Sequence, residues 1–104
     1  MKMEELVKNR LSDNGDIRVG IDVGSTTVKL VITDINTDDV VYSKYVRHNA
    51  RQIDTTRNLL SEVKELLSGE NFKAAVCGSG GKPVSRALGI HYIQAVSYTH
   101  LRAH

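Results

Sequence analysis

Cysteine is nearly absent from this sequence, and long hydrophobic runs are absent altogether. The single cysteine, Cys77, excludes an internal disulfide framework, and one thiol alone cannot build a zinc or iron–sulfur site. No apolar run approaches the roughly 20 residues that span a bilayer. The N-terminus is charged and lacks the apolar stretch of a signal peptide. These features predict a cytoplasmic protein with no membrane partner.

A cluster of basic residues is also missing. The sequence has 14 Lys and Arg against 12 Asp and Glu, a net charge of +2, and its basic residues are scattered. We therefore expect no nucleic-acid partner. The composition, 40% hydrophobic and 25% charged over 104 residues, is typical of one small globular domain.

Hydrophobic spacing changes along the first half of the chain. Helical spacing over the first residues, followed by a polar break, predicts an N-terminal helical extension at residues 1–16. Three strands with alternating apolar and polar residues are predicted next, at residues 17–22, 27–34 and 40–46. Because only short turns connect these strands, they must form an antiparallel meander.

The second half predicts helices that alternate with strands. A helix capped by Asp54 or Thr55 and ended by Gly69 is expected first. The later elements are a strand at 72–77, a glycine-rich loop at 78–81, a short helix with Pro83 in its first position, and a strand at 90–96. The order βββαβαβ predicts an α/β fold with a mixed sheet over residues 17–96.

Residues 97–104 fit none of this pattern. They resemble the peptide that arises when a gene prediction reads through a sequencing-adapter sequence. We therefore expect a non-native tail, and a natural protein that continues differently after about Val96.

The most informative segment runs from Gly20 to Lys29 and reads Gly-Ile-Asp-Val-Gly-Ser-Thr-Thr-Val-Lys. It predicts a strand, a tight turn and a second strand. Main-chain N–H groups and hydroxyls in such a turn can hold a phosphate chain, and glycine removes the Cβ that would block its approach. The candidate phosphate-binding residues are Gly24, Ser25, Thr26, Thr27 and Lys29. Asp22 ends its strand at the same place, so it is the candidate catalytic residue and would hold Mg²⁺ through water.

An ordinary hairpin with a glycine in its turn is the alternative interpretation. We favour phosphate binding because an acid, a glycine and three successive hydroxyl residues lie between the two strands, with a lysine five positions after Gly24. The segment is neither a Walker A loop nor a Rossmann fingerprint, because G-x-x-x-x-G-K-[ST] is absent and no G-x-G-x-x-G follows a strand.

At these residues the chain resembles the first phosphate motif of the superfamily of acetate and sugar kinases, Hsp70 and actin. The spelling is most similar to the ATPase activators of 2-hydroxyacyl-CoA dehydratases and to benzoyl-CoA reductase ATPase subunits. The similarity runs from about Ile17 to Val96, but only the first motif is specific. The residues Ser79-Gly80-Gly81-Lys82 depart from the family's usual sequence at this position. For the loop at 78–81, both a nucleotide-facing loop and a plain strand-to-helix turn remain open.

The resemblance implies an ATPase with an RNase H-like, actin-like fold, of which this chain is a truncated N-terminal half-domain. In that family, two subunits share a [4Fe–4S] cluster, and hydrolysis of ATP with Mg²⁺ drives an electron into a 2-hydroxyacyl-CoA dehydratase. The implied cofactors are thus ATP and Mg²⁺, and the implied partners are a dehydratase and a second copy in the full-length protein. The cluster cysteines, a second phosphate motif and an adenosine-binding segment are absent from this sequence. We therefore expect the isolated chain to bind ATP weakly and to have no useful turnover.

Other functions use the same phosphate turn. A small-molecule kinase of the sugar-kinase type would add a catalytic aspartate and a substrate pocket, whereas an ATP-dependent assembly protein would polymerise, and an inactive fragment would do neither. Elsewhere the residues have structural interpretations: Cys77 as a buried thiol, His48 and His91 as structural histidines, and the leucine stripe at 59–67 as core.

Overall fold

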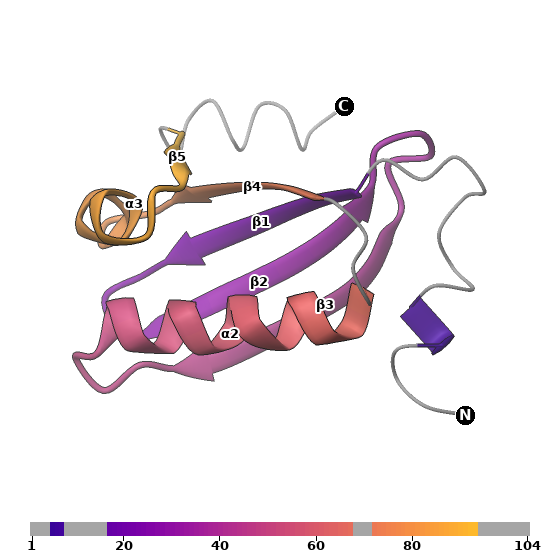
Figure 1. The fold of residues 1–104 in the computed structure, drawn as a ribbon. Helices are drawn as coiled ribbons and strands as arrows, with labels where there is room; N and C mark the ends of the chain where they lie inside the picture. The colour runs from indigo at the N-terminus through magenta and orange to yellow at the C-terminus, as the bar shows by residue number, and fades with distance from the viewer. Residues whose placement is uncertain (1–4, 8–16, 68–71, 94–104) are drawn as a thin grey trace.

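The computed structural model describes residues 5–7, 17–67 and 72–93. In chain order the elements are β1 (Ile17–Val23), β2 (Thr27–Asp34), β3 (Val40–Arg47), α2 (Gln52–Leu67), β4 (Phe72–Cys77), α3 (Gly81–Leu88) and β5 (His91–Tyr92). The strands form one sheet in the order β3-β2-β1-β4-β5, and α2 crosses one face of it (Figure 1). The predicted order βββαβαβ is confirmed.

The first three strands form the predicted antiparallel meander. In β1, Ile17, Val19 and Ile21 are buried while Arg18 and Asp22 are exposed, so one face of the strand belongs to the core. β2 pairs antiparallel with β1 on one side and with β3 on the other. This pairing places β2 in the interior of the meander and leaves β3 at the edge of the sheet.

The other half of the sheet is parallel. β4 pairs in parallel with β1, and β5 pairs in parallel with β4. Parallel strands need a crossover, and α2 leads from β3 to β4 across the sheet. On α2 the side chains of Leu59, Val63 and Leu67 are buried in the core, which confirms the structural interpretation of the leucine stripe.

One hydrophobic core lies between the sheet and the helices. Its buried members come from β1, β2, β3, α2, β4 and α3, together with Val7: they are Ile17, Val19, Ile21, Val23, Val28, Leu30, Ile32, Val41, Leu59, Val63, Leu67, Val76 and Val84. Of the predicted extension at 1–16, residues 5–7 are described; they are helical, and Val7 is buried in this core. The predicted tail at 97–104 lies outside the described residues.

The boundaries of the helices differ from the predicted ones. α2 begins at Gln52, so Asp54 and Thr55 both lie inside the helix and neither is the cap. The Asp54 carboxylate accepts a hydrogen bond from Arg57 at 3.1 Å, and an acid in the first turn suits the helix dipole. The predicted end at Gly69 lies outside the described residues. Pro83 is the third residue of α3 and not the first, but it still lies in the turn whose N–H groups need no helical partner.

The last strand is shorter than predicted within the described residues. β5 covers His91–Tyr92, and Ile93 continues it with an N–H that donates to the C=O of Val76 at 2.8 Å. The remainder of the predicted strand, residues 94–96, lies outside the described residues.

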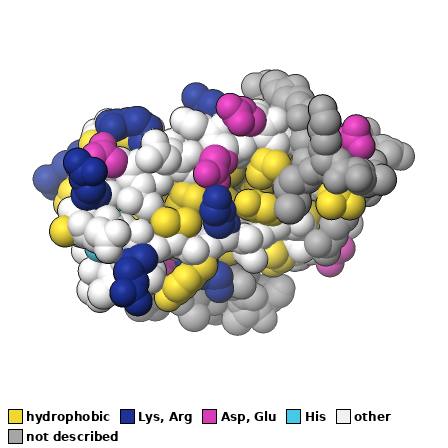
Figure 2. Space-filling model, turned by 90° about the horizontal axis from the view of Figure 1, so that it is seen from below, with side chains coloured by type: hydrophobic (Ala, Val, Ile, Leu, Met, Phe, Trp, Pro, Cys, Tyr) yellow, Lys and Arg dark blue, Asp and Glu magenta, His cyan; other side chains and the backbone are white. Residues whose placement is uncertain are grey.

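No helix in the described parts of the chain is long and apolar enough to cross a membrane. Seen from below the view of Figure 1, hydrophobic side chains are interspersed with basic and acidic ones (Figure 2). Both signs of charge occur on this face, as the scattered charges of the sequence predict.

Candidate functional site

The candidate site is built on the turn between β1 and β2, residues 24–27. The N–H of Gly24 donates to the C=O of Thr27 at 2.8 Å, which closes the turn and leaves Ser25 and Thr26 exposed at its tip. Among the described residues, the N–H groups of Ser25 and Thr26 donate to no main-chain carbonyl. Two amides and two hydroxyls at the tip are thus available to a ligand.

Asp22 and Lys29 are brought together by the pairing of β1 with β2. They are direct partners in the antiparallel register, and both side chains are exposed. Directly opposed residues point to the same face, with Cβ atoms about 5 Å apart. The acid and the base therefore stand side by side on the sheet face, immediately next to the 24–27 turn.

Gly78, in the loop at 78–81, lies directly against Asp22. A Cβ built on Gly78 would stand 2.5 Å from Oδ1 of Asp22 and 2.4 Å from the C=O of Val23, and the φ of Gly78 is +98°. Only glycine fits both the contact and the backbone conformation. The N–H of Gly80 also donates to the C=O of Val23 at 2.9 Å, so this loop is fastened to the end of β1.

Sequence reasoning did not identify this contact. The loop was open to two interpretations, and the structure makes it the neighbour of the candidate catalytic carboxylate. The only local signal was a run of glycines directly after a predicted strand. The register that pairs Asp22 with Cys77 in parallel strands decides the contact, and sequence spacing does not contain that register.

Gly24 is different, because none of the described residues requires a glycine there. A Cβ built on Gly24 would lie 3.4 Å from the C=O of Thr27 and 3.8 Å from its Oγ1, which are ordinary contacts. Its φ is outside the left-handed region, since the glycines with positive φ among the described residues are Gly78 and Gly89. Space for an outside ligand is therefore a sufficient reason for glycine at this position.

Three residues that sequence analysis did not assign to the site lie next to the 24–27 turn. On β3, Tyr45 is the register partner of Lys29, and Arg47 is the register partner of Thr27. The hydroxyl of Thr27 donates to the Tyr45 hydroxyl at 3.1 Å. His48, which sequence analysis assigned a structural role, is 3% exposed, and its main-chain N–H donates to the C=O of Thr26 at 3.0 Å.

The described residues fit some of the implied cofactors and not others. One exposed carboxylate beside free amides and a lysine suits Mg²⁺, which keeps most of its waters and binds together with phosphates. For a [4Fe–4S] cluster the residues do not fit. Cys77 is buried, and within the described ranges no three His, Cys, Asp or Glu side chains gather as metal ligands.

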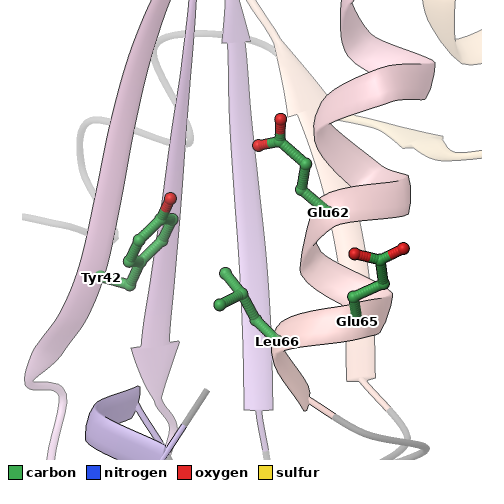
Figure 3. Close-up of a pocket in the computed structure, with 4 residues that line it drawn as sticks. All are labelled: Tyr42, Glu62, Glu65 and Leu66. Atoms are coloured by element: carbon green, nitrogen blue, oxygen red, sulfur yellow. The ribbon is translucent and has the colours of Figure 1, made fainter. Parts of the chain in front are cut away.

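A surface pocket lies between β3 and α2, away from the 24–27 turn. Tyr42 of β3 lines it together with Glu62, Glu65 and Leu66 of α2 (Figure 3). Tyr42 pairs with Ile32, five residues along β2 from Thr27, which is roughly 16 Å. Its two carboxylates would repel a phosphate, so this pocket does not belong to the candidate site.

Comparison with known proteins supports the fold. No protein-family model matches the sequence, and no curated protein matches it either. Among solved structures, the ethanolamine utilization protein EutJ from Carboxydothermus hydrogenoformans is 21% identical, with a TM-score of 0.56 over 88% of this chain and 44% of that one. The activator of the 2-hydroxyisocaproyl-CoA dehydratase from Clostridium difficile, with bound ADPNP, is 24% identical, with a TM-score of 0.53 over 78% of this chain and 30% of that one.

The fold is the actin-like, RNase H-like one. The mixed five-stranded sheet and its order agree with the predicted fold class. The chain spans less than half the length of either solved structure.

Proposed function

We propose that this chain is the ATP-phosphate-binding segment of an actin-like ATPase that activates a 2-hydroxyacyl-CoA dehydratase by ATP-driven electron transfer. The observation that carries the proposal is the 24–27 turn, with exposed amides and hydroxyls at its tip and the Asp22–Lys29 pair beside it. A turn that needed only to join two strands would not require this set of groups on one face.

Each residue of the proposed site has a distinct role. The amides of Ser25, Thr26 and Thr27 and the hydroxyls of Ser25 and Thr26 hold phosphate oxygens, and Lys29 adds a positive charge. Asp22 binds Mg²⁺ through water and orients the water that attacks the terminal phosphate. Mg²⁺ held by Asp22 would screen the charge of the phosphates, and Gly24 leaves the room that their approach needs.

The role in dehydratase activation rests on the amino-acid sequence of the motif at residues 20–29. One structure with the same fold is a dehydratase activator that holds ADPNP, which is consistent with this role but at 24% identity extends only to the fold. A dehydratase partner, a homodimer and a shared [4Fe–4S] cluster belong to the same proposal, and the described residues of this chain provide no site for the cluster.

Titration of the chain with Mg-ADPNP, followed by ¹H–¹⁵N NMR, tests the phosphate site. The amides of Ser25 and Thr26 should shift first, and binding should depend on Mg²⁺. Asp22→Ala and Lys29→Ala should each weaken binding by about tenfold, which is the loss of one charge-assisted contact. Asp39→Ala, which removes an exposed carboxylate from the turn at the far end of β2, is the matched control and should bind as the wild type does.

The specific activity needs the complete protein and a dehydratase. ATP-dependent reduction of the dehydratase, lost in Asp22→Ala, is the expected result. Phosphorylation of a sugar, or nucleotide-dependent polymerisation without electron transfer, would instead support a kinase or an assembly protein. If millimolar Mg-ADPNP left the amides of the 24–27 turn unshifted, the phosphate site itself would be wrong.

A further inference from the structure

His48 joins the 24–27 turn to the segment that leads into α2. Its ring Nε2 is 2.9 Å from the C=O of Gly24, and its main-chain N–H donates to the C=O of Thr26 at 3.0 Å. On the other side of the ring, the N–H of Ala50 donates to Nδ1 at 3.0 Å. One buried residue thus contacts two carbonyls of the turn and one amide of the following segment.

These contacts determine the tautomer of the ring. Nδ1 accepts a hydrogen bond from Ala50, so it carries a lone pair and no proton. The C=O of Gly24 can only accept, so Nε2 must carry the proton and donate. The hydrogen bonds therefore place a proton on Nε2, directed at the turn.

The segment after His48 is in a conformation that its residues rarely adopt. Asn49 and Ala50 have φ values of +51° and +65°. Asparagine tolerates the left-handed region, but alanine does not, and the strain at Ala50 persists only where surrounding contacts impose it. The Ala50–Nδ1 bond, together with the N–H of Arg51 donating to the C=O of His48 at 2.8 Å, supplies such contacts.

We propose that His48 is a positioning residue that aims the phosphate-binding amides of the 24–27 turn, an inference that rests on the proposed function. The peptide unit is planar and trans, so a C=O and the N–H of the next residue point in opposite directions. Holding the carbonyls of Gly24 and Thr26 therefore turns the N–H groups of Ser25 and Thr27 away from His48. Together with the N–H of Thr26, these two N–H groups are the donors that a phosphate would use at the turn.

The geometry of the turn supports this assignment. In a plain two-residue hairpin, the carbonyl of Gly24 would accept from the N–H of Thr27. Among the described residues only the reverse bond forms, from the N–H of Gly24 to the C=O of Thr27. The ring N–H of His48 donates to the carbonyl of Gly24 instead, and the N–H of Thr27 has no main-chain acceptor in the turn.

Two substitutions separate the two sides of the ring. Glutamine places an amide N–H₂ near the position of Nε2, so His48→Gln keeps the donor to Gly24 and loses the acceptor for Ala50. Asparagine places an oxygen near Nδ1, so His48→Asn keeps the acceptor and loses the donor. Because the main-chain bond to Thr26 does not involve the side chain, the two variants differ in which ring contact they keep, the one with Gly24 or the one with Ala50.

The experiment uses this chain and Mg-ADPNP. His48→Asn should weaken binding about tenfold, whereas His48→Gln should bind within about threefold of the wild type. If His48 only stabilised the segment at Ala50, the order would be reversed. Equal binding by both variants, or an equal loss in both while each stays folded, would overturn the proposal.

A measurement without ligand tests the same contacts independently of nucleotide binding. A long-range ¹H–¹⁵N spectrum of the wild type should show His48 with its proton on Nε2, and His48→Asn should shift the Ser25 amide more than His48→Gln does. A proton on Nδ1 would overturn the proposal. If these spectra are as expected but Mg-ADPNP does not bind, the proposed function fails while the structural role of His48 stands.

Discussion

Replacing Gly78 with alanine should be one of the most damaging single-methyl changes in this chain. The new Cβ would lie 2.4 Å from the C=O of Val23 and 2.5 Å from Oδ1 of Asp22. The φ of +98° adds backbone strain of about 1–3 kcal/mol, and the forced repacking adds a further cost of about 1–3 kcal/mol. We therefore expect Gly78→Ala to lower the free energy of unfolding by about 2–6 kcal/mol.

Urea unfolding followed by circular dichroism measures this loss. Gly24→Ala is the matched control, because it adds the same methyl group at the other loop beside Asp22 and meets no atom closer than 3.4 Å. With slopes of about 1–3 kcal/mol per molar urea, Gly78→Ala should lower the midpoint by about 1 M or more, and Gly24→Ala by far less. Equal midpoints for the two variants would refute the steric argument. Gly24→Ala should nevertheless weaken Mg-ADPNP binding, since its methyl group occupies the space proposed for phosphate.

Three further predictions concern residues outside the turn. Thr56→Val should raise the free energy of unfolding by about 1 kcal/mol in urea, because the buried Thr56 hydroxyl has no partner among the described residues; an unchanged or lower value would contradict this. Ala50→Gly should raise Tm by relieving a positive φ, whereas Ala87→Gly, in helix α3, should lower it; calorimetric shifts of the same sign would argue against strain at Ala50. The hydrogen bond from Lys44 to Glu62, 2.8 Å long, raises the pKa of Lys44 above 10.5. The pair should therefore add about 0.2–1 kcal/mol to the free energy of unfolding below pH 10.5, and this contribution should disappear as the pH rises through the raised pKa. The difference in urea midpoint between wild type and Lys44→Met should therefore shrink from about pH 7 to about pH 12, and a constant difference would speak against the ion pair.

Most of the fold could be predicted because its periodicity is local. Ile17, Val19 and Ile21 alternate with polar residues, and this alternation alone identifies a strand with one buried face. The boundary of α2 was harder to predict. Asp54 has the chemistry of a cap, but the helix begins at Gln52, and Asp54 pairs with Arg57 instead. Capping propensity is a weak signal when an upstream turn, here the one at His48, determines where the chain enters the helix.

Sequence alone could suggest the candidate site where its residues are contiguous, but not where they are distant along the chain. The residues of the 24–27 turn are neighbours in sequence, so their chemistry could be recognised together. Strand pairing brings Gly78 and His48 next to the 24–27 turn and Asp22, and no residue near them in the sequence indicates this contact. An isolated histidine indicates no particular function until the carbonyls that it contacts are known.

The mixed topology of the sheet explains why these groups meet. β1 and β4 are parallel, so the loops that follow their carboxyl ends lie at the same end of the sheet, next to the start of α2 (Figure 1). β2 is antiparallel to β1, so the chain returns beside Asp22 and brings Lys29 to the same face. Because the β1 turn leads into a strand, no helix N-terminus follows it to attract phosphate through aligned amides. The turn itself therefore offers individual N–H groups and no helix end, so their direction, which His48 holds through the carbonyls of Gly24 and Thr26, should matter for affinity.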